Sequence, residues 1–174
     1  TIKTTLNASK IFLKYAYDNK YMTSDVYKNI KPYKQVKKTI VVLSTEDINK
    51  LLSSQNEFTI IGLRNLLVIS LMLDAGLRVS EVVNLNVEDI SKELGVIKVF
   101  GKGKKERLVP LTDSIIKYYD KYVFLASLYS GALFLDSDTG LRMTSSGISQ
   151  ILRRIKKEQH FNKLHPHYLR HTFA

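Results

Sequence analysis

Apolar residues recur at helical spacing along most of this 174-residue chain. Ser44, Thr112 and Thr144 stand before three of the apolar stretches and can cap the first turn of a helix, while Gly76 interrupts a fourth. The stretch 57–74 is apolar on most sides, so we expect it to be a buried helix. The predicted helices span residues 4–17, 44–53, 57–74, 111–129 and 144–157, and shorter ones begin near Ser24, Val79 and Pro166.

Short strands are predicted between the helical stretches. Residues 95–100 and 107–109 have the composition of strands and flank Gly101-Lys102-Gly103-Lys104-Lys105. This arrangement predicts a hairpin with a cationic tip, and residues 133–135 predict a further short strand. The order of helices, a small antiparallel sheet and more helices favours an α+β fold that is mostly helical.

The chain is expected to form one domain and an appendage, because 174 residues with 44% hydrophobic content bury one ordinary core. A basic stretch with little apolar content separates the two parts, and its lysines are Lys31, Lys34, Lys37 and Lys38. Such a stretch is typical of a linker, which either lies along DNA or is simply solvated. We place the boundary after residue 38, so that the main domain spans 39–174.

The formal net charge of +11 indicates a polyanionic partner. Lys and Arg release condensed counterions when they meet phosphates, so nucleic acid is the first candidate and an anionic membrane surface the second. No apolar run approaches the about 20 residues that span a bilayer, which excludes a transmembrane helix. The absence of cysteine excludes disulfides and thiolate metal sites and suits the cytoplasm. Because the chain lacks an initial Met and ends within a helical stretch, we expect a fragment of a longer protein.

Two groups of residues suit phosphate binding. Arg78 stands at the start of a helix with Glu81 one turn later, and a carboxylate at that spacing can fix the orientation of a guanidinium. An ordinary surface ion pair would have the same spacing. Lys102 lies between two glycines at the hairpin tip, so its ammonium and the backbone can approach a ligand closely, although a solvated turn remains an alternative. A nucleotide-binding phosphate loop is excluded, because the required glycine spacing and following helix are missing.

The densest group of functional side chains is His165-Pro166-His167-Tyr168-Leu169-Arg170-His171. His167 and Arg170 fall on one helical face, where an imidazole can transfer a proton beside a guanidinium that binds an oxyanion. No cysteine or neighbouring carboxylate completes a zinc set with these histidines, so we expect no metal and assign structural roles to His165 and His171.

The combination of three segments resembles the motifs of tyrosine site-specific recombinases and phage integrases. The segments are 76–81, 101–111 and 166–174, and residues 44–47 resemble the usual entry to the catalytic domain of that family. The resemblance implies a recombinase catalytic domain with a small antiparallel sheet. It also implies that residues 1–38 are the tail of a helical, SAM-like core-binding domain followed by its linker.

The resemblance further implies roles for individual residues in DNA cleavage and rejoining through a 3′-phosphotyrosyl intermediate. Arg78, Lys102, His167 and Arg170 match the family's catalytic positions, and Glu81 matches the acidic residue that supports the first arginine. The nucleophilic tyrosine has no counterpart in this chain, so we expect the fragment to be inactive in cleavage. No cofactor is expected. Tyr118, Tyr119 and Tyr122 are interpreted as packing residues, as is Tyr168.

Double-stranded DNA is the expected partner, and no membrane is expected. We expect DNA contacts chiefly to phosphates, from Lys31, Lys34, Lys37, Lys38, Lys104, Lys105, Arg153, Arg154, Lys156 and Lys157. The last four also fit a solvated helix face. Family resemblance implies a tetrameric synaptic assembly on DNA, a nucleoid-associated cytoplasmic location, and a monomeric fragment in solution.

Two other functions remain open at this stage. A noncatalytic sequence-specific DNA-binding module would use Arg78 and Arg170 no differently from any other basic residue. An enzyme similar to a type IB topoisomerase would share the chemistry and relax supercoiled DNA without needing a particular sequence.

Overall fold

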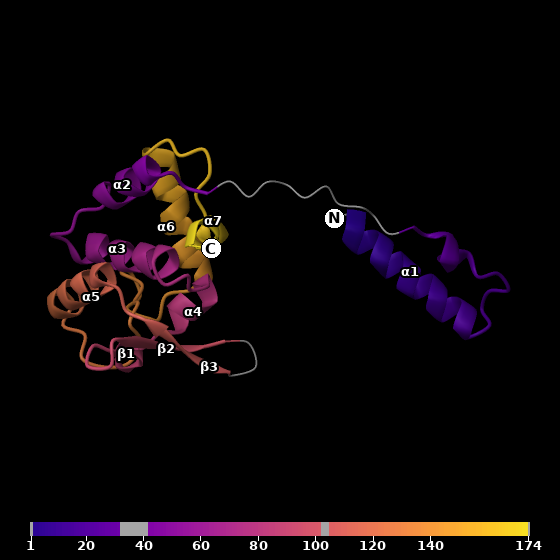
Figure 1. Ribbon diagram of the computed structural model, residues 1–174, viewed down its shortest axis with the longest axis horizontal. Coiled ribbons are helices and arrows are strands. Elements are labelled where there is room, and N and C mark those ends of the chain that lie inside the picture. Colours follow the sequence, from indigo (N-terminus) through magenta and orange to yellow (C-terminus); the bar gives the residue numbers. More distant parts are fainter. Residues whose placement is uncertain (1, 32–41, 102–104, 174) are drawn as a thin grey trace. The chain divides into compact units, whose positions relative to one another are not determined.

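The computed structural model describes residues 2–31, 42–101 and 105–173. The chain divides into two compact units, Thr1–Ile40 and Val41–Ala174, each of which is described by itself (Figure 1). This division lies close to the boundary expected after residue 38. That boundary stays a prediction, because residues 32–41 lie outside the described residues.

The first unit consists of two helical segments. The helix α1 spans Ile2–Asp18, which confirms the helix predicted over 4–17, and the 3-10 helix η1 spans Val26–Asn29. The rings of Tyr17 and Tyr27 lie with their centroids 5.8 Å apart, and Ala16 is buried. These contacts join η1 to α1 around a small core.

The second unit contains ten described elements, and their order matches the predicted α+β arrangement. In chain order they are α2 (Thr45–Ser53), α3 (Ile60–Leu73), α4 (Val79–Asn84), the 3-10 helix η2 (Val87–Asp89), β1 (Ile90–Ser91), β2 (Val96–Phe100), β3 (Glu106–Pro110), α5 (Asp113–Leu125), α6 (Ser145–Glu158) and α7 (Pro166–Phe173). In Figure 1 the sheet lies at one end of this unit, and α2 and α6 lie at the other.

The helix α3 is the centre of the core. All its residues from Gly62 to Leu73 are buried, and the helix packs against α5 and α7. This confirms the prediction of a buried helix, but its predicted start at residue 57 is wrong. Thr59 has extended backbone and its hydroxyl accepts the Gly62 N–H at 3.1 Å, so the cap fixes the first turn at Ile60.

The sheet is antiparallel in the order β1-β2-β3. Val99 pairs with Arg107 and Phe100 with Glu106, and the Gly101 N–H donates to the Lys105 carbonyl at 2.8 Å at the base of the hairpin. The predicted hairpin is therefore confirmed, although β1 was not predicted. Two residues are too few to produce an alternating pattern, which explains the omission.

Two predicted elements are wrong. Residues 133–135 form no strand but are flanked by single bridges, Asn86 with Ala132 and Leu135 with Arg142. The apolar run exists because Leu133 and Phe134 are fully buried, and burial in a core does not require pairing along the run. The helix predicted over 111–129 ends at Leu125, because Ser127 adopts a left-handed conformation with φ of 50°.

Within the described ranges, no helix is long and apolar enough to cross a membrane.

Candidate active site

A left-handed turn places Arg78 at the entrance of α4. Gly76 has φ of +60°, and the Leu77 N–H donates to the Leu71 carbonyl at 3.0 Å, closing the turn that follows α3. Leu77 is fully buried and anchors the turn in the core. The next residue, Arg78, is the N-cap of α4, and its side chain is 56% exposed. The guanidinium of Arg78 is therefore exposed to solvent, while the turn that carries it is anchored in the core.

The carboxylate of Glu81 binds both the backbone and the side chain of Arg78. Glu81 is only 5% exposed. Its Oε2 accepts the Arg78 backbone N–H at 2.7 Å, and its Oε1 accepts from Arg78 Nη1 at 3.0 Å. The predicted Arg78–Glu81 pair therefore differs from an ordinary surface ion pair, because its carboxylate is buried and accepts two hydrogen bonds from Arg78.

A third residue completes the cluster. Arg107 of β3 donates from Nη1 to Glu81 Oε1 at 2.8 Å and from Nη2 to Oε2 at 2.9 Å, a bidentate ion pair. Burial raises the pKa of Glu81, but hydrogen bonds from Arg107 and Arg78 outweigh burial and bring this pKa to about 2. The sequence did not indicate Arg107, because the pair joins residues 26 apart in different elements. The only available signal was that Arg107 is the one charged residue of the predicted strand 107–109.

The base of the hairpin lies beside this cluster. A cavity of about 450 Å³ is lined by Arg78, Ser80, Glu81, Asn84, Phe100 and Gly101. It therefore joins the start of α4 to the end of β2. Lys102 and Lys104 of the tip lie outside the described residues, as do Lys34, Lys37 and Lys38. Lys105, the first described residue after the tip, is exposed.

Helix α7 carries the other two candidate catalytic residues. Arg170 donates from Nη1 to the carbonyl of Gly76, so the second arginine is bound to the turn that precedes Arg78. His167 is exposed on the same helix, which is anchored by the fully buried Leu169. The structure thus brings Arg78, Glu81 and the Arg170 side chain to one turn, and their catalytic roles stay predictions.

Neighbouring residues of α7 have structural roles. The Nδ1 of His165 accepts the Tyr168 N–H at 3.2 Å, which caps α7 and confirms the structural role predicted for His165. Burial, followed by the charges of His167 and His171, lowers the pKa of His165. The Tyr168 hydroxyl donates to the Val42 carbonyl at 3.3 Å, consistent with the packing role predicted for this tyrosine. His171 is exposed, and its structural role stays a prediction.

The tyrosines of α5 were predicted as packing residues, and two are confirmed as such. Tyr122 is buried and stacks on Phe134 with ring centroids 6.1 Å apart. Tyr119 is also buried, and its hydroxyl donates to the Val87 carbonyl at 3.3 Å. Burial raises the pKa of both phenols, which disfavours the phenolate that a nucleophile requires. Tyr118 packs partly buried against the same core.

The basic residues of α6 divide between two faces. Lys156 acts electrostatically on His165 at the start of α7, whereas Arg154 acts on Arg64 of α3. Two residues along an α-helix are about 200° apart, which accounts for the division. Arg153 and Lys157 are exposed. DNA binding by all four stays a prediction.

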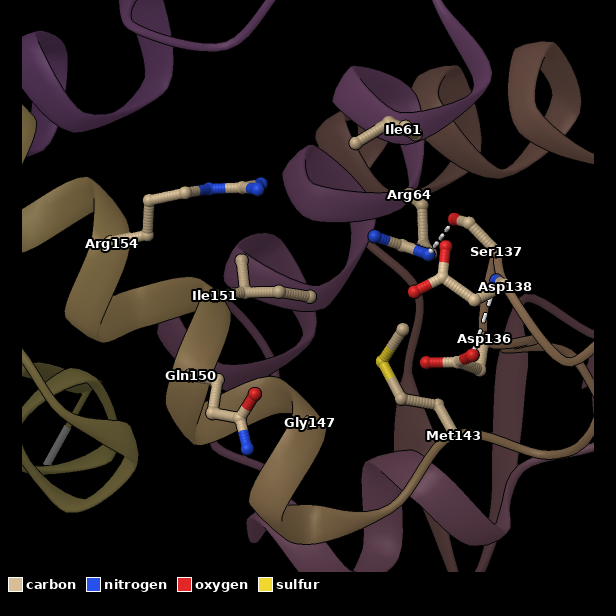
Figure 2. Close-up of a pocket in the computed structure, with 10 residues that line it drawn as sticks. All are labelled: Ile61, Arg64, Asp136, Ser137, Asp138, Met143, Gly147, Gln150, Ile151 and Arg154. Carbon is tan, nitrogen blue, oxygen red and sulfur yellow. Dashed lines mark hydrogen bonds between the residues drawn. The ribbon is translucent and has the colours of Figure 1, made fainter.

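The cavity beside Arg154 is separate from the cluster around Glu81. It measures about 410 Å³, and Figure 2 shows the guanidinium of Arg154 extending from α6 toward that of Arg64. Arg64 is 6% exposed and donates from Nη1 to the Leu135 carbonyl at 3.1 Å and to Ser137 Oγ at 2.8 Å. Asp136 and Asp138 line the same cavity and balance the two arginines, so its charge does not favour a polyanion.

Within the part of the chain that the structure describes, no group of three or more His, Asp or Glu side chains is placed to hold a metal ion. The candidate site instead offers guanidinium groups and an imidazole. Arg78 uses one N–H of its five for Glu81, so the remaining donors can bind the oxygens of a phosphate.

Comparisons with known proteins agree with this geometry. The sequence model of the phage integrase family matches residues 41–174. The tyrosine recombinase XerD of Staphylococcus haemolyticus (strain JCSC1435) is 32% identical over 176 residues, covering 97% of this chain and 59% of the relative. The chain therefore spans about three fifths of that relative.

Two solved structures illustrate the shared fold. The site-specific recombinase XerH, bound to its difH substrate in a pre-cleavage complex, is 27% identical with a TM-score of 0.65, covering 84% of this chain and 46% of that chain. A lambda integrase tetramer bound to a Holliday junction is 16% identical with a TM-score of 0.75, covering 98% and 52%. The second unit accordingly has the fold of a tyrosine recombinase catalytic domain.

Proposed function

Because this chain belongs to the phage integrase family, we propose that the intact protein performs site-specific DNA recombination or integration. In this reaction a tyrosine oxygen attacks a DNA phosphodiester, the bond to the 5′-oxygen breaks, and a 3′-phosphotyrosyl link forms. A 5′-hydroxyl of a second strand then attacks the link and releases the tyrosine. The number of phosphodiester bonds is unchanged over the two steps, so the reaction requires no external energy source.

One observation of this structure carries the proposal. Arg78 is half exposed and faces a cavity, while its backbone and its Nη1 are both held by the buried Glu81. A guanidinium fixed in this way needs no reorganisation when charge develops on a phosphate oxygen, which is the condition for electrostatic catalysis. An arginine that only bound DNA would gain little from so rigid a support.

We assign the catalytic roles as follows. Arg78 and Arg170 stabilise charge on the nonbridging oxygens, and donors of this kind each contribute about 3 kcal/mol to transition-state stabilisation in other enzymes. Lys102 supplies a proton to the departing 5′-oxygen. His167, exposed beside Arg170 on α7, accepts the proton of the nucleophile or steadies the phosphate.

Double-stranded DNA is the proposed partner. The relatives XerH and lambda integrase were solved bound to DNA, and the latter forms a tetramer on a Holliday junction. We propose a similar tetramer for the intact protein, in which residues 1–38 end a SAM-like core-binding domain. Contacts to phosphates come from the linker lysines, the hairpin tip and α6, and binding to chromosomal DNA places the protein with the nucleoid.

The proposal is tested in the intact protein by comparing wild type with Arg78→Ala. A DNA site is first selected from a random duplex library, and a nicked duplex carrying that site then traps the covalent protein–DNA adduct on a denaturing gel. We expect Arg78→Ala to bind the duplex nearly as well as wild type, but to form adduct about 10²- to 10³-fold more slowly.

Two results would contradict the proposal. If wild type binds the selected site and never forms an adduct, the protein is a noncatalytic DNA-binding module. If Arg78→Ala forms adduct as quickly as wild type, the catalytic role assigned to Arg78 is wrong. Relaxation of supercoiled plasmids that lack the selected site would instead indicate an enzyme similar to a type IB topoisomerase.

A further inference from the structure

The carboxylate of Glu81 is shared between two elements that are remote in the sequence. Arg78 at the start of α4 supplies two donors, its backbone N–H and Nη1. Arg107 of β3 supplies two more, Nη1 and Nη2. Each carboxylate oxygen therefore accepts one hydrogen bond from each arginine, and the pair of arginines together fixes both the position and the plane of the carboxylate.

We propose that Arg107 is a positioning residue for the DNA cleavage reaction, which acts by locking Glu81 and, through it, Arg78. This inference rests on the function proposed above. Both terminal nitrogens of Arg107 donate to Glu81, so its guanidinium is directed at α4 and its effect reaches the phosphate through Arg78. Arg107 is consequently distinct from the groups that touch DNA in the proposed mechanism.

The bidentate geometry explains how Arg107 acts. A carboxylate that accepts two parallel N–H bonds from one guanidinium cannot rotate without breaking both. Its remaining lone pairs then point at the Arg78 backbone and side chain. Removal of Arg107 leaves a buried carboxylate with donors from one residue only, free to turn and harder to keep ionised, so Arg78 loses its fixed orientation.

The same contact also secures the hairpin. Arg107 pairs with Val99 across β2 and β3, and the Gly101–Lys105 hydrogen bond closes the hairpin just beyond it. The ion pair to Glu81 is thus a polar link between the hairpin base and α4. Arg107 therefore fixes the position of Arg78 relative to the hairpin base at Gly101.

The test compares Arg107→Met, Arg107→Lys and a matched control, Lys98→Met, in the intact protein. Lys98 also lies in the hairpin and forms a single ion pair, with Glu106 at 3.1 Å, in which both side chains are 45% exposed. It makes no contact with Glu81 among the described hydrogen bonds and ion pairs, so Lys98→Met reports the loss of a hairpin cation together with its contact over the Phe100 ring, 5.5 Å from the ring centroid. The measurements are DNA affinity by fluorescence anisotropy, adduct formation on the nicked duplex, and thermal melting by circular dichroism.

We expect Arg107→Met to bind the selected duplex within about 3-fold of wild type and to form adduct about 10- to 100-fold more slowly, as the loss of charged hydrogen bonds implies. Arg107→Lys should recover part of this rate, because Lys keeps the charge but not the bidentate fork. Lys98→Met should cleave as wild type does. These rates are divided by the folded fraction from the melting curves, so that a loss of folded protein is not counted as a loss of chemistry.

The pH dependence separates positioning from a purely structural role. Without Arg107 the pKa of Glu81 rises, so the ratio of the Arg107→Met rate to the wild-type rate should fall as the pH is lowered from about 7 to about 5. A constant ratio, or a normal rate per folded molecule in Arg107→Met, would overturn the inference. The proposed function fails separately, when wild type forms no adduct or when Arg78→Ala forms it normally.

Discussion

Replacement of Glu81 by Gln tests the energetic account of the cluster directly, even without a DNA substrate. The pKa of Glu81 falls from 4.5 to about 2 in the folded protein. At about 1.4 kcal/mol per pKa unit, this corresponds to about 3 kcal/mol of stabilisation that depends on ionisation of the carboxylate. Gln keeps the shape of the side chain but carries no charge, so Glu81→Gln should lose that contribution at neutral pH.

The sign of the pH dependence follows from the lowered pKa. A carboxyl whose pKa is lower in the folded state stabilises the protein fully above its unfolded pKa, and this stabilisation is lost as the pH falls toward the folded pKa. The difference in unfolding free energy between wild type and Glu81→Gln should therefore be largest above about pH 5 and should shrink steadily toward about pH 2.

Urea denaturation followed by circular dichroism at several pH values measures this difference. Glu57→Gln is the matched control, because Glu57 also has a lowered pKa through Lys121 and Lys117 but lies on the surface. The control should show a much smaller difference. A Glu81→Gln difference that stays constant between pH 7 and pH 3 would refute the reasoning, since the stabilisation would then not come from the ionised carboxylate.

Two further predictions concern the neighbours of the cluster. Gly76→Ala would place a Cβ 2.3 Å from Cδ1 of Phe173 at φ of +60°, whereas Gly140→Ala meets nothing within 4 Å at φ of +67°. We expect the first to lower the unfolding free energy by about 1–3 kcal/mol more than the second, measured by thermal melting, and equal effects would show that α7 does not pack on this turn. His165→Ala should cost about 1 kcal/mol through loss of the cap on the Tyr168 N–H. Because burial lowers the pKa of His165, the difference from wild type should diminish below about pH 6.5, and a difference that grows there would contradict the assignment.

The local features of the fold were predictable where the sequence contains its own signals. Ser44, Thr112 and Thr144 each accept a backbone N–H three residues later, and the helices after them begin where predicted. The start of α3 was misjudged because Phe58 precedes Thr59, so an apolar side chain stands before the residue that caps the helix. The end of α5 was misjudged because a left-handed Ser127 has no strong signal in the sequence.

In the candidate site, too, only the contacts between residues close in sequence could be predicted. Arg78 and Glu81 are one helical turn apart, so their contact follows from spacing alone. The contact of Glu81 with Arg107 depends on how the hairpin docks on α4, and no local pattern contains that information. The division of the α6 cations also depends on tertiary packing, since only the positions of α3 and α7 decide which face meets His165 and which meets Arg64.

The turn at Gly76 affects the order in which the parts of the candidate active site assemble. Its carbonyl accepts the hydrogen bond of Arg170, a residue 94 positions later, and a Cβ on it would overlap the ring of Phe173. During synthesis on the ribosome, Arg78 emerges long before α7 exists. The nascent chain can therefore form the Arg78–Glu81–Arg107 cluster while Arg170 is still absent, and the two guanidiniums of the site meet only after α7 has been made and docked. Until α7 docks on the turn at Gly76, the chain therefore has only one of the two arginines that are proposed to bind the phosphate.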